Sequence, residues 1–146
     1  LFGTISEKKL AILGFAFKAN TNDTRESPAI RICKDLLEEG CYLNIFDPKV
    51  NELQIKEELG VNDKDRLPET NRGSWVFTSS ITQAVNGADA IVVLTDWSEF
   101  NNLNFENFSK IMRSPSWVFD TRNVVNVKAA KLYGFKVWKL GDGSTN

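Results

Sequence analysis

Short apolar segments alternate with amphipathic ones along the chain, and glycine, proline or polar residues separate them. The apolar segments predict strands at 9–14, 41–46, 75–78, 90–95, 116–120 and 136–140. Apolar residues at helical spacing predict helices at 28–39, 52–59, 81–86, 105–112 and 127–133. Segment 90–95 is the clearest apolar run, so we expect a central strand that is covered on both faces.

This alternation predicts an α/β fold: a doubly wound, mainly parallel, Rossmann-like sheet of five to six strands with helices on both faces. The length of 146 residues suits a single domain spanning 1–146. Ser27 and Pro28 predict a capped helix start, and Gly40 predicts the end of that helix. Its core-facing residues should be Ile32, Cys33, Leu36 and Leu37. The polar segment 64–73 is predicted to be a mobile loop, and 141–146 a tail.

Three loops follow predicted strands, at 15–27, 95–100 and 121–126. Right-handed crossovers bring such loops to one edge of the sheet, where ligands bind in open α/β folds. Lys18 in the first loop and Arg122 in the last should therefore converge, in a way that suits a phosphate or carboxylate. On the residues alone two alternatives stay open: the cations are merely solvated, and Arg25 pairs with the adjacent Glu26.

The first loop lacks the glycine pattern of a dinucleotide site, G-x-G-x-x-G, because only Gly14 is present. Phe15 and Phe17 would also hinder the approach of a pyrophosphate. We interpret Asp47, at the end of the second strand, as a turn residue rather than a ribose ligand. Trp97 either walls the ligand cleft or covers the end of the sheet.

Composition narrows the function classes. The net charge of −1 gives no basic surplus for nucleic acid or membrane, although a local basic patch stays possible. No apolar run approaches the ~20 residues of a membrane span. The chain has no histidine, and we expect no metal site. Cys33 and Cys41 are expected to be buried and structural, and so few cysteines favour a cytoplasmic protein.

Four segments, in order along nearly the whole chain, resemble the UDP-glucose/GDP-mannose dehydrogenase family in its carboxy-terminal, UDP-sugar-binding domain. They are Gly14–Pro28, Tyr42–Pro48, Ala88–Trp97 with Phe100, and Phe119–Arg122. The Thr95-Asp96-Trp97 loop is similar to that of the UDP-glucose enzymes in particular. Those enzymes oxidise UDP-glucose to UDP-glucuronate with two NAD. The resemblance implies that Phe17 and Lys18 contact the sugar end of the substrate, that Arg122 binds its sugar-phosphate portion, and that Arg25 reaches towards NAD.

The resemblance also implies parts that this sequence does not match. They are an amino-terminal NAD domain, a G-x-C-[FL]-x-K-D segment carrying the nucleophile, and a long central helix, of which only Leu1–Ser6 could remain. The chain begins at Leu1 and its single methionine is Met112, so we expect a fragment. It should have no catalytic residue of its own, be inactive alone, and work with the rest of its polypeptide in a homo-oligomer.

Two alternatives remain at this point. One is the corresponding domain of a GDP-mannose or UDP-N-acetylmannosamine dehydrogenase, which shares the opening motif. The other is a stand-alone nucleotide-sugar-binding module without catalysis.

Overall fold

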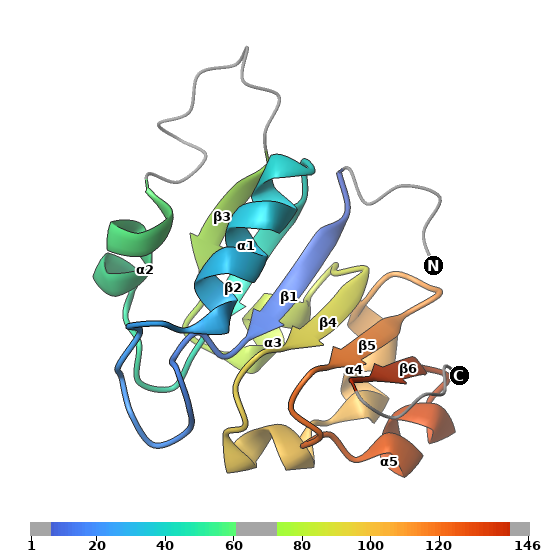
Figure 1. Cartoon of the computed structure of the whole chain (residues 1–146). Helices are drawn as coiled ribbons and strands as arrows, with labels where there is room; N and C mark the ends of the chain where they lie inside the picture. The colour runs from blue at the N-terminus through green and yellow to red at the C-terminus, as the bar shows by residue number, and fades with distance from the viewer. Residues whose placement is uncertain (1–6, 61–72, 141–146) are drawn as a thin grey trace.

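A six-stranded, wholly parallel sheet organises the computed structural model, which describes residues 7–60 and 73–140 (Figure 1). The strand order is β3-β2-β1-β4-β5-β6. The strands are β1 (Lys9–Leu13), β2 (Tyr42–Phe46), β3 (Ser74–Phe77), β4 (Ala90–Val93), β5 (Trp117–Asp120) and β6 (Lys136–Lys139). This architecture confirms the predicted doubly wound, Rossmann-like fold.

Five α-helices and a 3₁₀ helix are described between the strands. They are α1 (Pro28–Glu38), α2 (Glu52–Leu59), α3 (Ile81–Val85), the 3₁₀ helix η3 (Ser98–Asn102), α4 (Phe105–Ile111) and α5 (Val127–Leu132). All the predicted strands and helices end within two residues of these bounds. The 3₁₀ helix was not predicted. The predicted loop at 64–73, apart from Gly73, lies outside the described residues, as do the tail at 141–146 and Leu1–Ser6.

Helix α1 begins and ends as its sequence predicts. The Ser27 hydroxyl accepts from the Ala29 N–H at 3.2 Å, and Pro28 occupies the first helical position. Gly40 follows the helix with a φ of +90°, a left-handed conformation that glycine adopts readily. Of the predicted core positions, Cys33 and Leu37 are buried, while Ile32 and Leu36 are partly buried against the same cluster.

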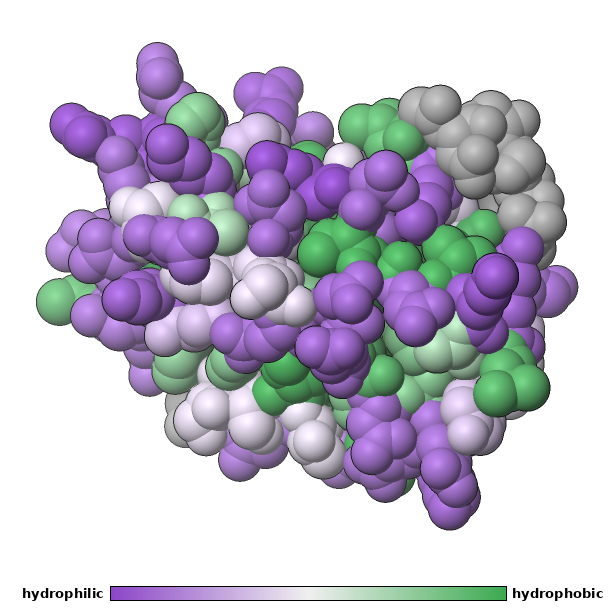
Figure 2. Space-filling view, turned by 90° about the horizontal axis from the view of Figure 1, so that it is seen from below, coloured by the Kyte–Doolittle hydropathy of each residue, from purple (hydrophilic) through white to green (hydrophobic). Residues whose placement is uncertain are grey.

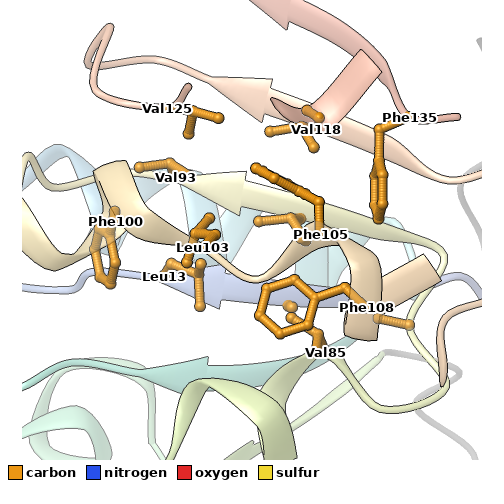
Figure 3. Packing of buried hydrophobic residues seen from close by; sticks show 14 of the residues in the cluster. Leu13, Val85, Val93, Phe100, Leu103, Phe105, Phe108, Val118, Val125 and Phe135 are labelled. Carbon is orange, nitrogen blue, oxygen red and sulfur yellow. The ribbon is translucent and has the colours of Figure 1, made fainter. Parts of the chain in front are cut away.

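The sheet separates two apolar clusters. On one face, Leu13, Val93 and Val118 pack with residues of η3, α3 and α4 (Figure 3). On the other face, α1 and α2 cover β1, β2 and β3, with Ile12 and Ile45 in this second cluster. All four residues of β4 are buried and contribute alternately to the two clusters, which confirms the predicted central strand. None of the described helices has the length and apolar character needed to cross a membrane.

Candidate ligand-binding site

The four inner strands end level with one another, and this sets the position of the site. Leu13 of β1 lies opposite Phe46 of β2 and Val93 of β4, and Val93 lies opposite Asp120 of β5. The loops that follow these strands therefore emerge side by side at the lower edge in Figure 1. The chain order reverses between β1 and β4, and such a switch point is where open α/β sheets bind ligands.

The loops after β1 and β4 are packed tightly together. Gly14 has a φ of +99°, and a Cβ atom there would lie 2.5 Å from the Cβ and Oγ1 atoms of Thr95. The Thr95 hydroxyl also donates to the Ala16 carbonyl at 2.9 Å. Glycine is therefore required at position 14 both for its backbone conformation and for this close approach.

Asp47 anchors the first loop to the end of β2. Its carboxylate is buried: Oδ2 accepts from the backbone N–H groups of Phe15 at 2.8 Å and Ala16 at 3.0 Å. Oδ1 accepts from the N–H groups of Lys49 at 2.8 Å and Val50 at 2.9 Å. These last two bonds form an Asx turn, which confirms the interpretation of Asp47 as a turn residue.

Trp97 covers the end of the sheet. Its side chain is buried in the cluster that faces η3 and α4, and its indole Nε1–H donates to Asp47 Oδ2 at 3.3 Å. Of the two alternatives drawn from the sequence, this placement supports the covering role. Asp47 consequently ties three loops together, from β1, β2 and β4.

A second buried carboxylate shapes the loop that carries Arg122. Asp120 is fully buried, and its Oδ1 accepts from the Arg122 N–H at 3.0 Å. Its Oδ2 accepts from the N–H groups of Val124 at 2.9 Å and Val125 at 2.8 Å. These bonds fix the backbone of the loop, and the Arg122 side chain is left about one-third exposed, at 31%.

Asp96 connects the two loops that carry the predicted ligand-binding cations. Its Oδ1 accepts from the Ala19 N–H at 3.2 Å, directly after Lys18, and its Oδ2 lies 3.8 Å from Arg122 Nη2. Lys18 and Arg122 are thus carried by neighbouring loops at one edge of the sheet. Sequence reasoning did not single out Asp96, although its place directly after the central strand was the available signal.

An open hollow of about 600 Å³ adjoins this junction. Arg122 and Asp96 line it, together with the polar residues Ser98, Asn101 and Asn102. Figure 2 shows the molecule from this side, where hydrophilic side chains prevail and apolar ones appear between them. A cation surrounded by hydroxyl and amide groups can bind a phosphate and donate to or accept from hydroxyl groups.

Arg25 and Phe17 lie at a separate, smaller hollow of about 380 Å³, which Asp23 and Glu26 also line. The ion pair of Arg25 is with Asp23: its Nε and Nη2 atoms donate to the carboxylate at 3.1 and 3.0 Å. These hydrogen bonds, together with one from the Arg25 backbone N–H at 2.9 Å, lower the pKa of Asp23 to about 2. The contacts of Phe17, Lys18, Arg25 and Arg122 with a ligand stay predictions.

Neither cysteine is placed to act as a nucleophile. Both thiols are buried, which confirms the predicted structural role. Burial raises the pKa of Cys33, and it raises the pKa of Cys41 to about 11. A thiolate is therefore strongly disfavoured at either position near neutral pH. Among residues 7–60 and 73–140 there is no metal-binding group of three or more His, Cys, Asp or Glu.

The β1 loop does not fit the pyrophosphate of NAD. In a dinucleotide site the backbone N–H groups after the first strand point at the phosphates. Here the N–H groups of Phe15 and Ala16 already donate to Asp47, and Thr95 fills the space beside Gly14. The fold thus resembles a dinucleotide-binding one, but the backbone N–H groups that would face a phosphate already donate to the protein's own carboxylate.

Several proteins of known activity are similar to this chain. It is 40% identical to UDP-glucose 6-dehydrogenase 2 of Arabidopsis thaliana and 41% identical to UDP-glucose 6-dehydrogenase of Drosophila melanogaster. The alignments cover 97% of this chain, and 31% and 30% of those relatives. The chain therefore spans about a third of the length of the relatives it matches.

Solved structures agree with the sequence matches. UDP-D-ManNAc dehydrogenase of Pyrococcus horikoshii superposes with a TM-score of 0.70 at 29% identity, over 96% of this chain and 27% of that one. The model of the UDP-glucose/GDP-mannose dehydrogenase family, UDP binding domain, matches residues 11–127. These residues include most of β1, all of β4 and β5, and the loops that form the candidate site. The chain belongs to the UDP-glucose/GDP-mannose dehydrogenase family and contains its UDP-binding domain.

Proposed function

We propose that this chain is the UDP-sugar-binding half of a UDP-glucose 6-dehydrogenase, which oxidises UDP-glucose to UDP-glucuronate with two NAD. The observation that carries the proposal is the junction at the carboxyl edge, where Asp96 links the Lys18 loop to the Arg122 guanidinium. The names of the relatives at about 40% identity support the choice of substrate.

Different residues at the carboxyl ends of the strands would contact different parts of the UDP-sugar. Arg122 can donate two parallel hydrogen bonds to a phosphate, and Lys18 adds a flexible positive charge from the next loop. Phe17, a residue that is 41% exposed, would lie against the sugar. The hydroxyl and amide groups of Ser98, Asn101 and Asn102 suit the polar parts of the ligand.

The chemistry of oxidation would rest with residues outside this chain. NAD is the hydride acceptor in such dehydrogenases. We propose that Arg25, in the loop after β1, contacts NAD and that residues outside this chain make most of the other contacts with it. Cys33 and Cys41 are buried with raised pKa values and would not serve as the nucleophile. This chain's own contribution is to bind and orient the UDP-sugar.

The alternative substrates are GDP-mannose and UDP-N-acetylmannosamine. The similarity to UDP-D-ManNAc dehydrogenase of Pyrococcus horikoshii, at 29% identity, leaves the second of these as the nearer competitor. The higher identity to UDP-glucose enzymes favours UDP-glucose. A stand-alone binding module would bind the same ligand, and it would differ from the enzyme half in having no partner domain.

Calorimetric titration of the 146-residue chain with UDP, UDP-glucose, UDP-N-acetylmannosamine and GDP-mannose tests the proposal. We expect UDP and UDP-glucose to bind, and Arg122→Ala and Lys18→Ala each to weaken binding by roughly tenfold, since each removes a charged contact to phosphate. Both substitutions should leave the melting temperature nearly unchanged, because Lys18 is exposed and the ion pair of the partly exposed Arg122 is long, at 3.8 Å.

Arg31→Ala is the matched control, because Arg31 also forms an exposed ion pair with an aspartate, Asp35, but on helix α1. Its binding should equal that of the wild type. Equal weakening by Arg31→Ala, or tighter binding of GDP-mannose than of UDP-glucose, would contradict the proposal.

A further inference from the structure

Asp96 contacts two different loops with its two carboxylate oxygens. Oδ1 accepts from the Ala19 N–H at 3.2 Å, and Oδ2 lies 3.8 Å from Arg122 Nη2. The first contact joins residues 77 positions apart. Asp96 lies three residues after the end of β4, a strand whose four residues are all buried. Its backbone is therefore attached to a well-packed part of the sheet.

Both contacts restrict a group that the proposed function uses. The backbone of Arg122 is fixed by Asp120, but its long side chain keeps several rotatable bonds that cost entropy to order. Asp96 limits where the guanidinium can lie. Ala19 directly follows Lys18, so its hydrogen bond limits the backbone from which the lysine projects. One carboxylate thereby constrains the spacing between two cations.

We propose that Asp96 is a positioning residue that holds the Lys18 loop and the Arg122 guanidinium in the arrangement that binds the diphosphate of a UDP-sugar. This inference rests on the proposed function of the site. Asp96 acts through its neighbours and needs no contact with the ligand. Its effect is to order the two cations before the ligand arrives, which reduces the entropy lost on binding.

Simple electrostatics predicts the opposite effect of removing this charge. A carboxylate beside an anion-binding arginine repels the anion, so its removal should tighten binding if only the charges matter. The Asp96 side chain is 45% exposed, and solvent screens that repulsion. Weaker binding of UDP after removal of the charge would therefore indicate positioning, whereas tighter binding would indicate that repulsion dominates.

Asp96→Asn and Asp96→Ala distinguish the two contacts. Asparagine keeps an oxygen that can accept from the Ala19 N–H but loses the charge opposite Arg122, whereas alanine loses both. In titrations of the chain with UDP, we expect Asp96→Asn to weaken binding roughly two- to fivefold, the order of an exposed ion pair, and Asp96→Ala to weaken it further. Asp35→Asn, which breaks the exposed Arg31 pair on α1, is the control and should have no effect.

Two further measurements separate positioning from other roles. The effect of Asp96→Asn should disappear in an Arg122→Met background, because the group to be positioned is gone. UDP and UDP-glucose should be weakened equally. A loss confined to UDP-glucose would make Asp96 an acceptor for sugar hydroxyls and overturn the inference.

A measurement without ligand tests the hydrogen bond between the Ala19 N–H and Asp96 itself. Amide hydrogen exchange at Ala19 should be faster in Asp96→Ala than in the wild type and little changed in Asp96→Asn. In the full-length polypeptide, Asp96→Asn should raise the KM for UDP-glucose and leave kcat within about twofold.

The failure of this inference differs from that of the proposed function. Unchanged or tighter binding of UDP by Asp96→Asn, with a wild type that binds, would overturn the positioning role alone. A wild type that binds neither UDP nor UDP-glucose would overturn the proposed function and this inference together.

Discussion

Arg25 and Arg122 each have an acidic partner, but the two pairs differ in geometry. Arg25 donates two hydrogen bonds to Asp23 at 3.1 and 3.0 Å, and its side chain is 87% exposed. Arg122 is more buried and meets Asp96 only at 3.8 Å. With respect to residues 7–60 and 73–140, Arg122 therefore keeps most of its donors free for a ligand, whereas Arg25 would have to share its donors with Asp23 or release it.

The Asp23–Arg25 pair gives a direct prediction of pH dependence. Its hydrogen bonds with Arg25 lower the pKa of Asp23 from 3.8 to about 2. A lowered pKa in the folded state means that the pair adds stability above pH 3.8, and that this contribution is lost as the pH falls towards 2. Carboxyl NMR titration should place the midpoint of Asp23 near 2.

Arg25→Ala is the control for this titration, because it removes the guanidinium donors and leaves in place the carboxyl and the backbone N–H that donates to its Oδ1 at 2.9 Å. The midpoint of Asp23 should then move up towards 3.8. Equal midpoints in the two proteins would show that the pair does not form in solution. The aspartate would then not restrain Arg25.

Single residues also show what the sequence could and could not predict about the site. The edge that carries Lys18 and Arg122 was predictable, because parallel strands bring their following loops to one side. Asp96 was not, because its contacts join residues far apart in the chain, and an aspartate in a loop ordinarily indicates only a solvated charge. The partner of Arg25 was predicted as Glu26 or solvent, but the loop turns so that Asp23 faces the guanidinium.

At the scale of elements, the junction of β1 and β4 determines the shape of the site. Strand and helix bounds were predictable because apolar periodicity and the caps at Ser27 and Gly40 are local signals. The adjacency of β1 and β4 depends on packing across the whole sheet, so the close contact of Gly14 with Thr95 could not be read from either segment.

Gly14→Ala tests that junction. The added Cβ would lie 2.5 Å from Thr95 atoms and 2.7 Å from its backbone nitrogen, at a φ of +99°. Strain and overpacking together should lower the free energy of unfolding by about 3 kcal/mol or more. Urea denaturation followed by circular dichroism measures the change.

Gly134→Ala isolates the contribution of backbone strain. Gly134 has a similar φ of +88°, but apart from its two chain neighbours no described residue would have an atom within 4 Å of a Cβ there. Its loss should be about 1–2 kcal/mol. If both substitutions cost the same, the contact between the β1 and β4 loops contributes little, and the site does not depend on close packing at the switch point.

At the scale of the whole molecule, the proposed function gives the chain one side of a binding site. It covers 31% of the length of its Arabidopsis relative, and the hollow that Arg122 lines in the described part of the chain is open. A ligand held on one side keeps only part of its contacts, so we expect binding by the chain alone to be weaker than binding by the full-length polypeptide.

The final prediction separates binding from catalysis. The 146-residue chain, mixed with UDP-glucose and NAD, should give no increase in absorbance at the NADH band, because its two thiols are buried and its β1 loop does not fit a pyrophosphate. The full-length polypeptide should produce NADH under the same conditions, and Lys18→Ala in it should lose far more turnover than melting temperature. NADH production by the chain alone would mean that a cysteine or another group in it becomes reactive, and it would contradict the division of binding and chemistry proposed here. Comparable losses of rate and melting temperature in Lys18→Ala would instead make that lysine a structural residue of the loop.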